Sequence, residues 1–216
     1  MNSHQMPIQP ERLSMESIQC VPCSLDVHDS HDVASLVYAS APDLFDPIFG
    51  RQAIALLTEF VGRSHNDYSH RYISVIEKDE AVLGAVVMLP AEAMGEDIDE
   101  AAVLNPIQGL RLWFVWTLVL RRILVHKFPA GTRYIANLAV RPEFRGQGLG
   151  TRLLQRCIEQ AKQAGVSALF INVDMKNGRA QRLYESLGFQ VIETHTMNLF
   201  GEHIGARLLK MSLNET

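Results

Sequence analysis

The chain has 216 residues, of which 47% are hydrophobic and 20% are charged, and its formal net charge is −4. This is the composition of an ordinary globular protein, and the chain is long enough to bury a sizeable core. The negative balance argues against a nucleic-acid coat or a basic membrane patch. Three cysteines are too few for a disulfide framework, and the longest apolar run, residues 112–120, is too short to span a bilayer. We therefore expect a soluble, cytoplasmic protein.

The N-terminal part is predicted to be a tail followed by an edge strand. Residues 1–15 show no periodicity and are expected to form a flexible tail, with a single domain over 16–216. A strand is predicted over 17–25, and Pro22 within it indicates an edge position. Cys20 and Cys23 lie three residues apart, which on a strand places the sulfurs on opposite faces, so we expect inert thiols.

Two helices and a hairpin are predicted next. A helix is expected from near Ser30 to Tyr38, with His28 and His31 as solvated residues at its start. The prolines within 41–47 are expected to break it before a second helix over 48–63. Strands over 72–77 and 81–89, separated by three polar residues, indicate a hairpin with a bulge at Gly84.

The segment 91–130 is harder to interpret. Residues 91–103 are acidic, and residues 106–128 have apolar residues at helical spacing. Trp113, Phe114 and Trp116 widen the apolar face of this predicted helix. Core packing is the favoured interpretation, and a substrate wall or a dimer contact is the alternative.

The chain is organised around residues 134–151, which read as a strand, a glycine loop and the start of a helix. Residues 134–140 are apolar apart from Asn137 in their centre, and Pro142 ends the strand. Glycine then occupies every second position, at Gly146, Gly148 and Gly150. Backbone N–H groups of such a loop can point at one oxyanion, and the helix dipole favours negative charge there. The pattern therefore predicts a phosphate-binding site.

Two common glycine loops do not match this stretch. A Walker loop needs a lysine directly after its last glycine, and none is present. The dinucleotide fingerprint needs glycine where Thr151 stands. The order Arg145-Gly-Gln-Gly-Leu-Gly150 is instead similar to the Arg/Gln-x-x-Gly-x-Gly/Ala loop that binds the acetyl-CoA pyrophosphate in the GNAT superfamily of N-acetyltransferases.

A second stretch strengthens this resemblance. A helix over 151–164 and an apolar strand over 166–173 complete a strand-helix-strand unit, whose strands are expected to be parallel. Residues 177–189 then resemble the second GNAT signature, Asn-x-x-Ala-x-x-Leu-Tyr-x-x-x-Gly-Phe. An antiparallel strand pair over 189–197 and 206–213 is predicted to close the chain, with Gly201 and Gly205 in the loop between them.

The resemblance covers about residues 72–213 and implies an α/β (α+β) fold. The expected fold is a mixed, mostly antiparallel seven-stranded sheet with helices on both faces. The strands over 134–140 and 166–173 would be its central parallel pair and would splay apart to admit the pantetheine arm. Segment 91–130 would be a variable helical insertion.

The resemblance also implies roles for individual residues. Tyr184 would be the general acid that protonates the departing CoA sulfur, although helical periodicity alone places it in the core. The residues that would bind acetyl-CoA are Leu138, Ala139, Val140, Arg145, Gly146, Gln147, Gly148, Leu149, Gly150, Thr151, Asn177 and Ala180. No metal is expected to take part.

The general base and the acceptor stay open. The strand over 134–140 carries no carboxylate or histidine. A water chain, bulk solvent, Glu92, Asp97 and His195 are the alternatives for removing the amine proton. The expected acceptor is a primary amine of a small molecule or peptide, attacked directly, with no nucleic-acid or membrane partner and a monomer or homodimer as the active form. A non-catalytic acyl-CoA-binding module is the alternative function.

Overall fold

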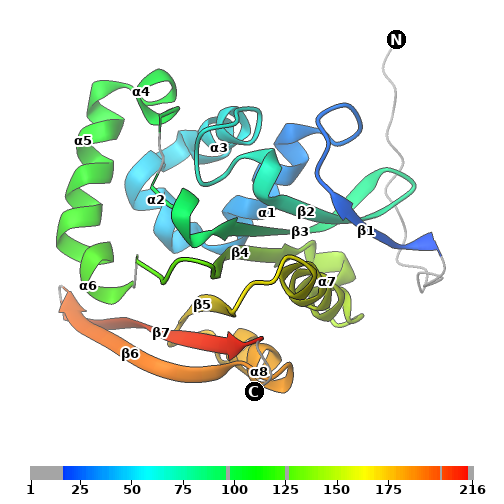
Figure 1. The fold of residues 1–216 in the computed structure, drawn as a ribbon. Helices are drawn as coiled ribbons and strands as arrows, with labels where there is room; N and C mark the ends of the chain where they lie inside the picture. Colours follow the sequence, from blue (N-terminus) through cyan, green and yellow to red (C-terminus); the bar gives the residue numbers. More distant parts are fainter. Residues whose placement is uncertain (1–16, 96–97, 125–126, 200, 214–216) are drawn as a thin grey trace, which may run out of the picture.

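The computed structural model describes residues 17–95, 98–124, 127–199 and 201–213, so the predicted tail over 1–15 lies outside it. Its centre is one seven-stranded sheet in the order β1-β2-β3-β4-β5-β7-β6 (Figure 1). The strands are β1 Gln19–Pro22, β2 Ile73–Lys78, β3 Ala81–Pro90, β4 Arg133–Val140, β5 Ala168–Asp174, β6 Gln190–Leu199 and β7 Glu202–Ser212. Among these seven strands of the described ranges, only β4 and β5 pair in parallel. The predicted fold is confirmed.

Helices cover both faces of this sheet (Figure 1). They are α1 Ser30–Ser40, α2 Pro42–Phe49, α3 Ala53–Val61, α4 Glu100–Val103, α5 Pro106–Val115, α6 Arg121–Ile123, α7 Leu149–Gln163 and α8 Gly178–Ser186. One core cluster joins the sheet to α1, α2 and α3, a second joins it to α7 and α8, and a small third one covers part of β5 and β7. Residues of the central strands therefore alternate between two buried faces of the sheet, which is why these strands are almost wholly apolar.

The edge position of β1 is confirmed, although the strand is shorter than predicted. It spans four residues and pairs only with β2, and Pro22 is its last residue. Cys20 packs against the α7 core, whereas Cys23 lies in the α1–α3 core. Burial raises the pKa of Cys23 to about 11, so both position and acidity exclude a reactive thiol pair.

The expectation of a solvated His28 is wrong. This side chain is buried, and its Nε2 lies 2.6 Å from Glu77 Oε2 on β2. Its Nδ1 accepts from the Ser24 backbone N–H at 2.9 Å. Because Nδ1 is an acceptor, Nε2 carries the proton and donates to the carboxylate. His28 therefore fastens the loop before α1 to the sheet.

Residues 41–47 end the first helix as predicted, since α1 stops at Ser40 and Ala41 is not helical, but the residues after Ala41 form the helix α2. Pro42 occupies the first turn of α2, where the missing N–H costs nothing, and Pro47 lies inside this helix. A second break, which was not predicted, falls at Gly50, which has a φ of 61° and begins a 3₁₀ turn before α3. The predicted helix over 48–63 is thus two helices.

The β2–β3 hairpin is confirmed in detail. Asp79 and Glu80 both have positive φ, as a two-residue hairpin turn requires. The register shifts between Ile76 and Glu77, so the bulge lies beside Gly84 as predicted. A side chain at Gly84 would come within 2.9 Å of the Ala139 carbonyl of β4. Glycine is needed there because two backbones approach closely.

The helix predicted over 106–128 is interrupted and shorter. It consists of α5, a π-helical turn over Trp116–Leu120 and α6, which ends at Ile123. Trp113 and Phe114 are exposed, so the preference for core packing is wrong. The inner face is made by other residues, among them Leu112 and Val115, which pack on the α1–α3 core.

The closing strands are longer than predicted. Gly205 lies within β7, opposite Thr196, and not in the connecting loop. A Cβ atom at Gly205 would overlap the His195 carbonyl of β6, so glycine permits the close approach of the two strands. Within the described ranges, none of the helices has the length and apolar character needed to cross a membrane.

Candidate acyl-transfer site

The glycine loop lies between β4 and α7 and has space above it. Gly146 and Gly148 have φ values of 80° and 79°, a left-handed conformation that favours glycine. Nothing lies within 4 Å of the position that a Cβ atom would take at either residue. Gly148 is the N-cap of α7. The loop therefore exposes backbone where an anion can approach.

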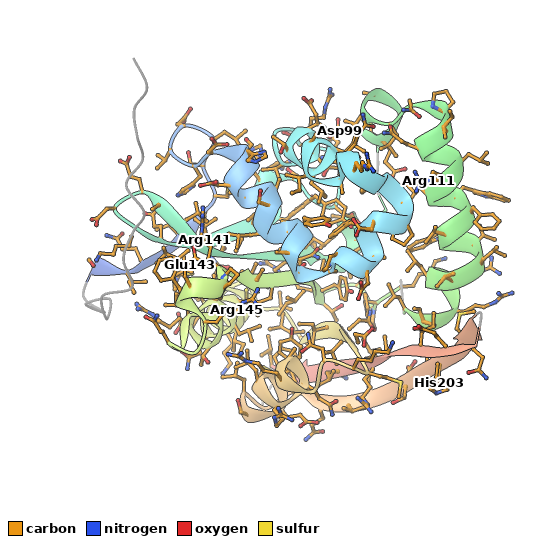
Figure 2. The ribbon with its side chains drawn as sticks, turned by 180° about the vertical axis from the view of Figure 1, so that it is seen from behind. Asp99, Arg111, Arg141, Glu143, Arg145 and His203 are labelled. Carbon is orange, nitrogen blue, oxygen red and sulfur yellow. The ribbon has the colours of Figure 1, made fainter. Side chains whose placement is uncertain are left out.

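Positive charge at this loop has two sources. The first-turn N–H groups of α7 have no intrahelical acceptors and point out of the helix end. Arg145 Nε donates to the Val140 carbonyl at 2.9 Å, which holds the guanidinium beside the loop (Figure 2). Arg141 is engaged elsewhere, with Nη2 donating to Asp32 at 2.8 Å and Nε to the Val82 carbonyl at 2.6 Å. Arg145 is therefore the side chain placed to meet an anion.

The parallel strands separate just before the loop. Between β4 and β5, only Arg133, Tyr134 and Ile135 have partners, which are Leu169, Phe170 and Ile171. A register shift opposite Val87 and Met88 leaves Ala136 as a bulge in β4. The remaining part of β4 thus runs away from β5, as the splayed pair was predicted to do. Its backbone groups on that side face the opening and not a partner strand.

The loop, β4 and α8 converge at Gly150. A Cβ atom there would lie 3.5 Å from Leu183 of α8, 3.8 Å from Leu138 and 4.0 Å from Val140. The structure therefore brings the two sequence signatures together, since Leu183 directly precedes Tyr184. Leu149 is buried in the core, so only its backbone can face a ligand.

Tyr184 lies in the core between the sheet and α8, with its ring 6.2 Å from that of Phe189. Desolvation raises the pKa of Tyr184, and the nearby Tyr134 phenol contributes a smaller increase. The hydroxyl is therefore protonated at neutral pH, the state that a proton donor needs. Both the packing and the acid interpretation are consistent with this burial.

Asn177 has a structural task that the sequence interpretation did not include. Its side chain caps α8 by accepting from the Ala180 N–H at 3.1 Å. This bond fixes the start of the helix that carries Tyr184. Asn177 and Ala180 thus lie together at the end of α8 nearest Asp174, where β5 ends.

Several polar groups near the opening were not identified from sequence. Tyr134 is packed beneath Phe128, with ring centroids 4.9 Å apart, and accepts from Asn172 Nδ2 at 3.2 Å. Asn137 is buried and donates to Ser40 Oγ on α1 at 2.7 Å. The partners come from elements 38 and 97 residues away in sequence, so no local signal could reveal them.

The three side chains considered as bases differ in placement. Glu92 accepts a hydrogen bond from the Gly131 N–H at 2.5 Å. This bond lowers the pKa of the Glu92 carboxyl and ties its side chain to the turn at Gly131. His195 Nε2 lies 2.8 Å from Glu193 Oε2 on exposed β6. Asp97 lies outside the described residues. His195 therefore pairs a ring nitrogen with a carboxylate.

A match to a known protein family covers both the glycine loop and α8. A model of the acetyltransferase (GNAT) family matches residues 37–189, more than half of the chain. The chain belongs to the GNAT acetyltransferase family. Both sequence signatures fall within the matched range.

Curated relatives match shorter stretches of this GNAT chain. GCN5-related N-acetyltransferase 6 of Arabidopsis thaliana is 39% identical over 61 residues, 28% of this chain and 21% of that protein. The Escherichia coli [ribosomal protein bS18]-alanine N-acetyltransferase is 45% identical over 53 residues, 24% of this chain and 36% of that protein. N-alpha-acetyltransferase 30 of Schizosaccharomyces pombe is 37% identical over 65 residues, 30% of this chain and 43% of that protein. The chain thus matches less than half the length of each.

Solved structures match over nearly the whole GNAT chain. An acetyltransferase crystal structure has a TM-score of 0.61 at 26% identity, covering 91% of this chain and 100% of that one. An N-acetyltransferase from Staphylococcus aureus has a TM-score of 0.69 at 19% identity, covering 89% and 100%. A GNAT acetyltransferase from Elizabethkingia anophelis with acetyl-CoA bound has a TM-score of 0.54 at 16% identity, covering 92% and 99%. These structures share the overall fold of this chain.

Proposed function

We propose that this protein is an N-acetyltransferase that transfers the acetyl group of acetyl-CoA to a primary amine by direct attack. The observation that carries this proposal is the meeting of three elements at Gly150: the glycine loop, the splayed part of β4 and the helix that bears Tyr184. Family membership over residues 37–189 supports it.

The cofactor residues are proposed from this geometry. The pyrophosphate would take the loop from Arg145 to Thr151, where backbone N–H groups and the end of α7 favour an anion. The pantetheine arm would enter between β4 and β5 and meet backbone groups of Leu138, Ala139 and Val140. Asn177 and Ala180 would flank the arm at the start of α8, with Gln147 at the exposed rim of the loop.

The chemistry requires one bond to form and one to break. The amine nitrogen, which must be neutral, forms a bond to the acetyl carbon, and the bond from that carbon to sulfur breaks. Backbone N–H groups of β4 would stabilise the negative charge that develops on the acetyl oxygen. Tyr184 would give its proton to the leaving sulfur, and the amine proton would pass to water or to a base. No step requires a metal.

A peptide or protein amine is the proposed acceptor class, and a small-molecule amine is the alternative. The names of the bS18-alanine and N-alpha relatives support the first, over the short stretches that they share with this chain. We also place the protein in the cytoplasm, because Cys20, Cys23 and Cys157 are all free thiols.

The cofactor site is tested by substitution at Gly148. We expect calorimetry to show micromolar or tighter binding of acetyl-CoA and CoA, in competition with each other. Gly148→Asp should weaken this binding at least about tenfold more than Gly148→Asn, because the two differ mainly in charge at the helix end. Gly95→Asp is the control for strain, since Gly95 has a φ of 78° with nothing within 4 Å of its Cβ position. Equal affinity of the folded Asp and Asn variants would exclude this loop as the phosphate site.

The reaction is tested separately by acetyl-CoA consumption with a panel of amines, from N-terminal peptides to small diamines. Turnover with one class identifies the acceptor. Tight binding of acetyl-CoA without turnover on any amine would favour the non-catalytic acyl-CoA-binding module. One observation favours that alternative, namely that Asn137 is the sole polar side chain in the bulged half of β4.

A further inference from the structure

The outer face of α5 is apolar and uncovered. It consists of Ile107, Leu110, Trp113, Phe114 and Leu118, whose exposed fractions are 71%, 64%, 61%, 56% and 38%. Their spacings of three and four residues place them on one side of α5 and the π-helical turn. α5 stands at the edge of the molecule with its outer side away from the sheet (Figure 1). Contiguous exposed apolar surface of this kind marks an interaction site.

Contacts on the opposite side fix this orientation. Gln108 is buried and donates from Nε2 to Gln52 Oε1 at 2.7 Å. Arg111 Nη2 donates to the Pro47 carbonyl of α2 at 3.0 Å. Leu112 and Val115 pack on the α1–α3 core. Rotating α5 to bury its outer face would break all of these contacts, so the outer face is a stable feature of the fold.

The stretch of chain that carries this face and continues past it has no acidic residue of its own. Residues 101–142 contain no aspartate or glutamate, although the whole chain has 24. The same range holds Arg121, Arg122 and Lys127, all exposed, just after α5 and the π-helical turn. An apolar stripe with tryptophan and phenylalanine, flanked by arginines, is typical of helices that lie in the headgroup region of a membrane.

We propose that the outer face of α5 docks on an anionic phospholipid bilayer. Trp113 and Phe114 would enter the boundary between headgroups and acyl chains, and Arg121 and Arg122 would meet lipid phosphates. This departs from the expectation based on net charge, because −4 is an average over a chain whose acidic residues lie elsewhere.

A second copy of the chain fits this face less well. Two such faces in contact would bring Arg121 and Arg122 of both copies near each other, and the segment 101–142 has no acidic side chain of its own to compensate. A lipid headgroup supplies the missing negative charge. The dimer is therefore the competing outcome in the experiment below.

Tryptophan fluorescence reports directly on this surface, because both tryptophans of the chain, Trp113 and Trp116, lie on α5 or the turn after it. The 216-residue protein is mixed with vesicles of phosphatidylcholine alone or with about one-third phosphatidylserine, and binding is measured by co-sedimentation and by the shift of the emission maximum. We expect a blue shift and co-sedimentation with the anionic vesicles, weakened by high salt.

Matched variants test the two parts of the surface. Trp113→Ser with Phe114→Ser, and Arg121→Glu with Arg122→Glu, should each weaken vesicle binding at least about tenfold. Val191→Ser with Ile192→Ser removes exposed apolar side chains from β6, and Lys162→Glu with Arg71→Glu makes the same charge change elsewhere. Both controls should bind like the wild type. Circular dichroism verifies that each variant is folded.

Three results would overturn the proposal. The first is that folded wild-type protein does not bind anionic vesicles. The second is that binding is equally weakened by the control variants. The third is a dimer in light scattering without lipid that Trp113→Ser with Phe114→Ser dissociates, which would make a second copy the occupant.

Discussion

Replacing Tyr184 with phenylalanine separates its two interpretations. As a proton donor Tyr184 needs its hydroxyl, whereas as a packing residue it needs mainly its ring. The ring lies 6.2 Å from Phe189 in the core beneath α8, and Tyr184→Phe keeps that contact and nearly all the buried apolar area. The substitution therefore removes the proton and leaves the packing.

The expected loss follows from the contribution of a positioned acid, typically a factor of about 10²–10⁴ in rate. Water can replace part of this contribution, so we expect turnover to fall at least about tenfold, which is about 1.4 kcal/mol of barrier. Burial raises the pKa of Tyr184 above its ordinary value of 10.0. The wild-type rate should therefore show no decline due to this acid below about pH 9.

The assay measures CoA release under saturating acetyl-CoA, together with acetyl-CoA affinity and melting temperature. Only turnover should change in Tyr184→Phe. Tyr72→Phe makes the same chemical change beside a cavity of about 440 Å³ at the far end of α7, and it should leave turnover unchanged. Full activity of Tyr184→Phe would reduce Tyr184 to a packing residue. A large fall in melting temperature would instead indicate a hydrogen bond of the hydroxyl in the core.

Three further predictions concern stability and are measured by urea denaturation. Gly205→Ala should lower the free energy of unfolding by about 1–3 kcal/mol because its Cβ would overlap a β6 carbonyl, whereas Gly109→Ala in α5 has open space and should raise it by about 0.5–1 kcal/mol. Glu77→Ala should cost about 1–3 kcal/mol by leaving the buried His28 Nε2–H without its acceptor, and an unchanged value would mean that water replaces it. Burial raises the pKa of Cys157 from 9.0 to about 12, so the native thiol keeps a proton that the unfolded chain releases. The resulting stability is complete below pH 9 and is lost towards pH 12, by up to about 1.4 kcal/mol per pH unit, and Cys157→Ala should flatten this decline.

The parts of the fold that were predictable from sequence are those with local physical signals. The positive φ of Gly146 and Gly148 favours glycine, so the loop is visible as closely spaced glycines. Strand β5 is buried on both faces, so it is visible as a continuous apolar run. The splay could be predicted only through the family resemblance, because the bulge at Ala136 has no signal in composition.

The wrong predictions depended on contacts distant in sequence. His28 can be buried because Glu77, 49 residues later, accepts a hydrogen bond from its ring. In α5, apolar residues occupy most sides of the helix, so periodicity could not choose the inner face. The inner face is determined by the hydrogen bond of Gln108 to Gln52 and by the packing of Leu112 on the α1–α3 core.

The lack of a carboxylate or histidine on β4 also affects which amine the proposed enzyme prefers. Asn137, held by Ser40, is an amide and cannot accept a proton at neutral pH, and Glu92 is engaged by Gly131. Without a base on β4, the rate depends on how much of the amine is already neutral. At pH 7.5 about a quarter of a peptide α-amine is neutral, against about one in a thousand for lysine, given reference pKa values near ~8.0 and ~10.4. This difference alone favours N-terminal amines by a factor of roughly 200.

That preference can be measured through the pH dependence of kcat/KM. With two peptide amines of different pKa, the rising limb should shift with the pKa of each amine, because the acceptor itself loses the proton in solution before it binds. A limb that stays at one pH for both amines would instead report a base on the protein. His195, beside Glu193 on β6, would then be the first residue to replace, and His195→Gln should abolish that limb without lowering acetyl-CoA affinity.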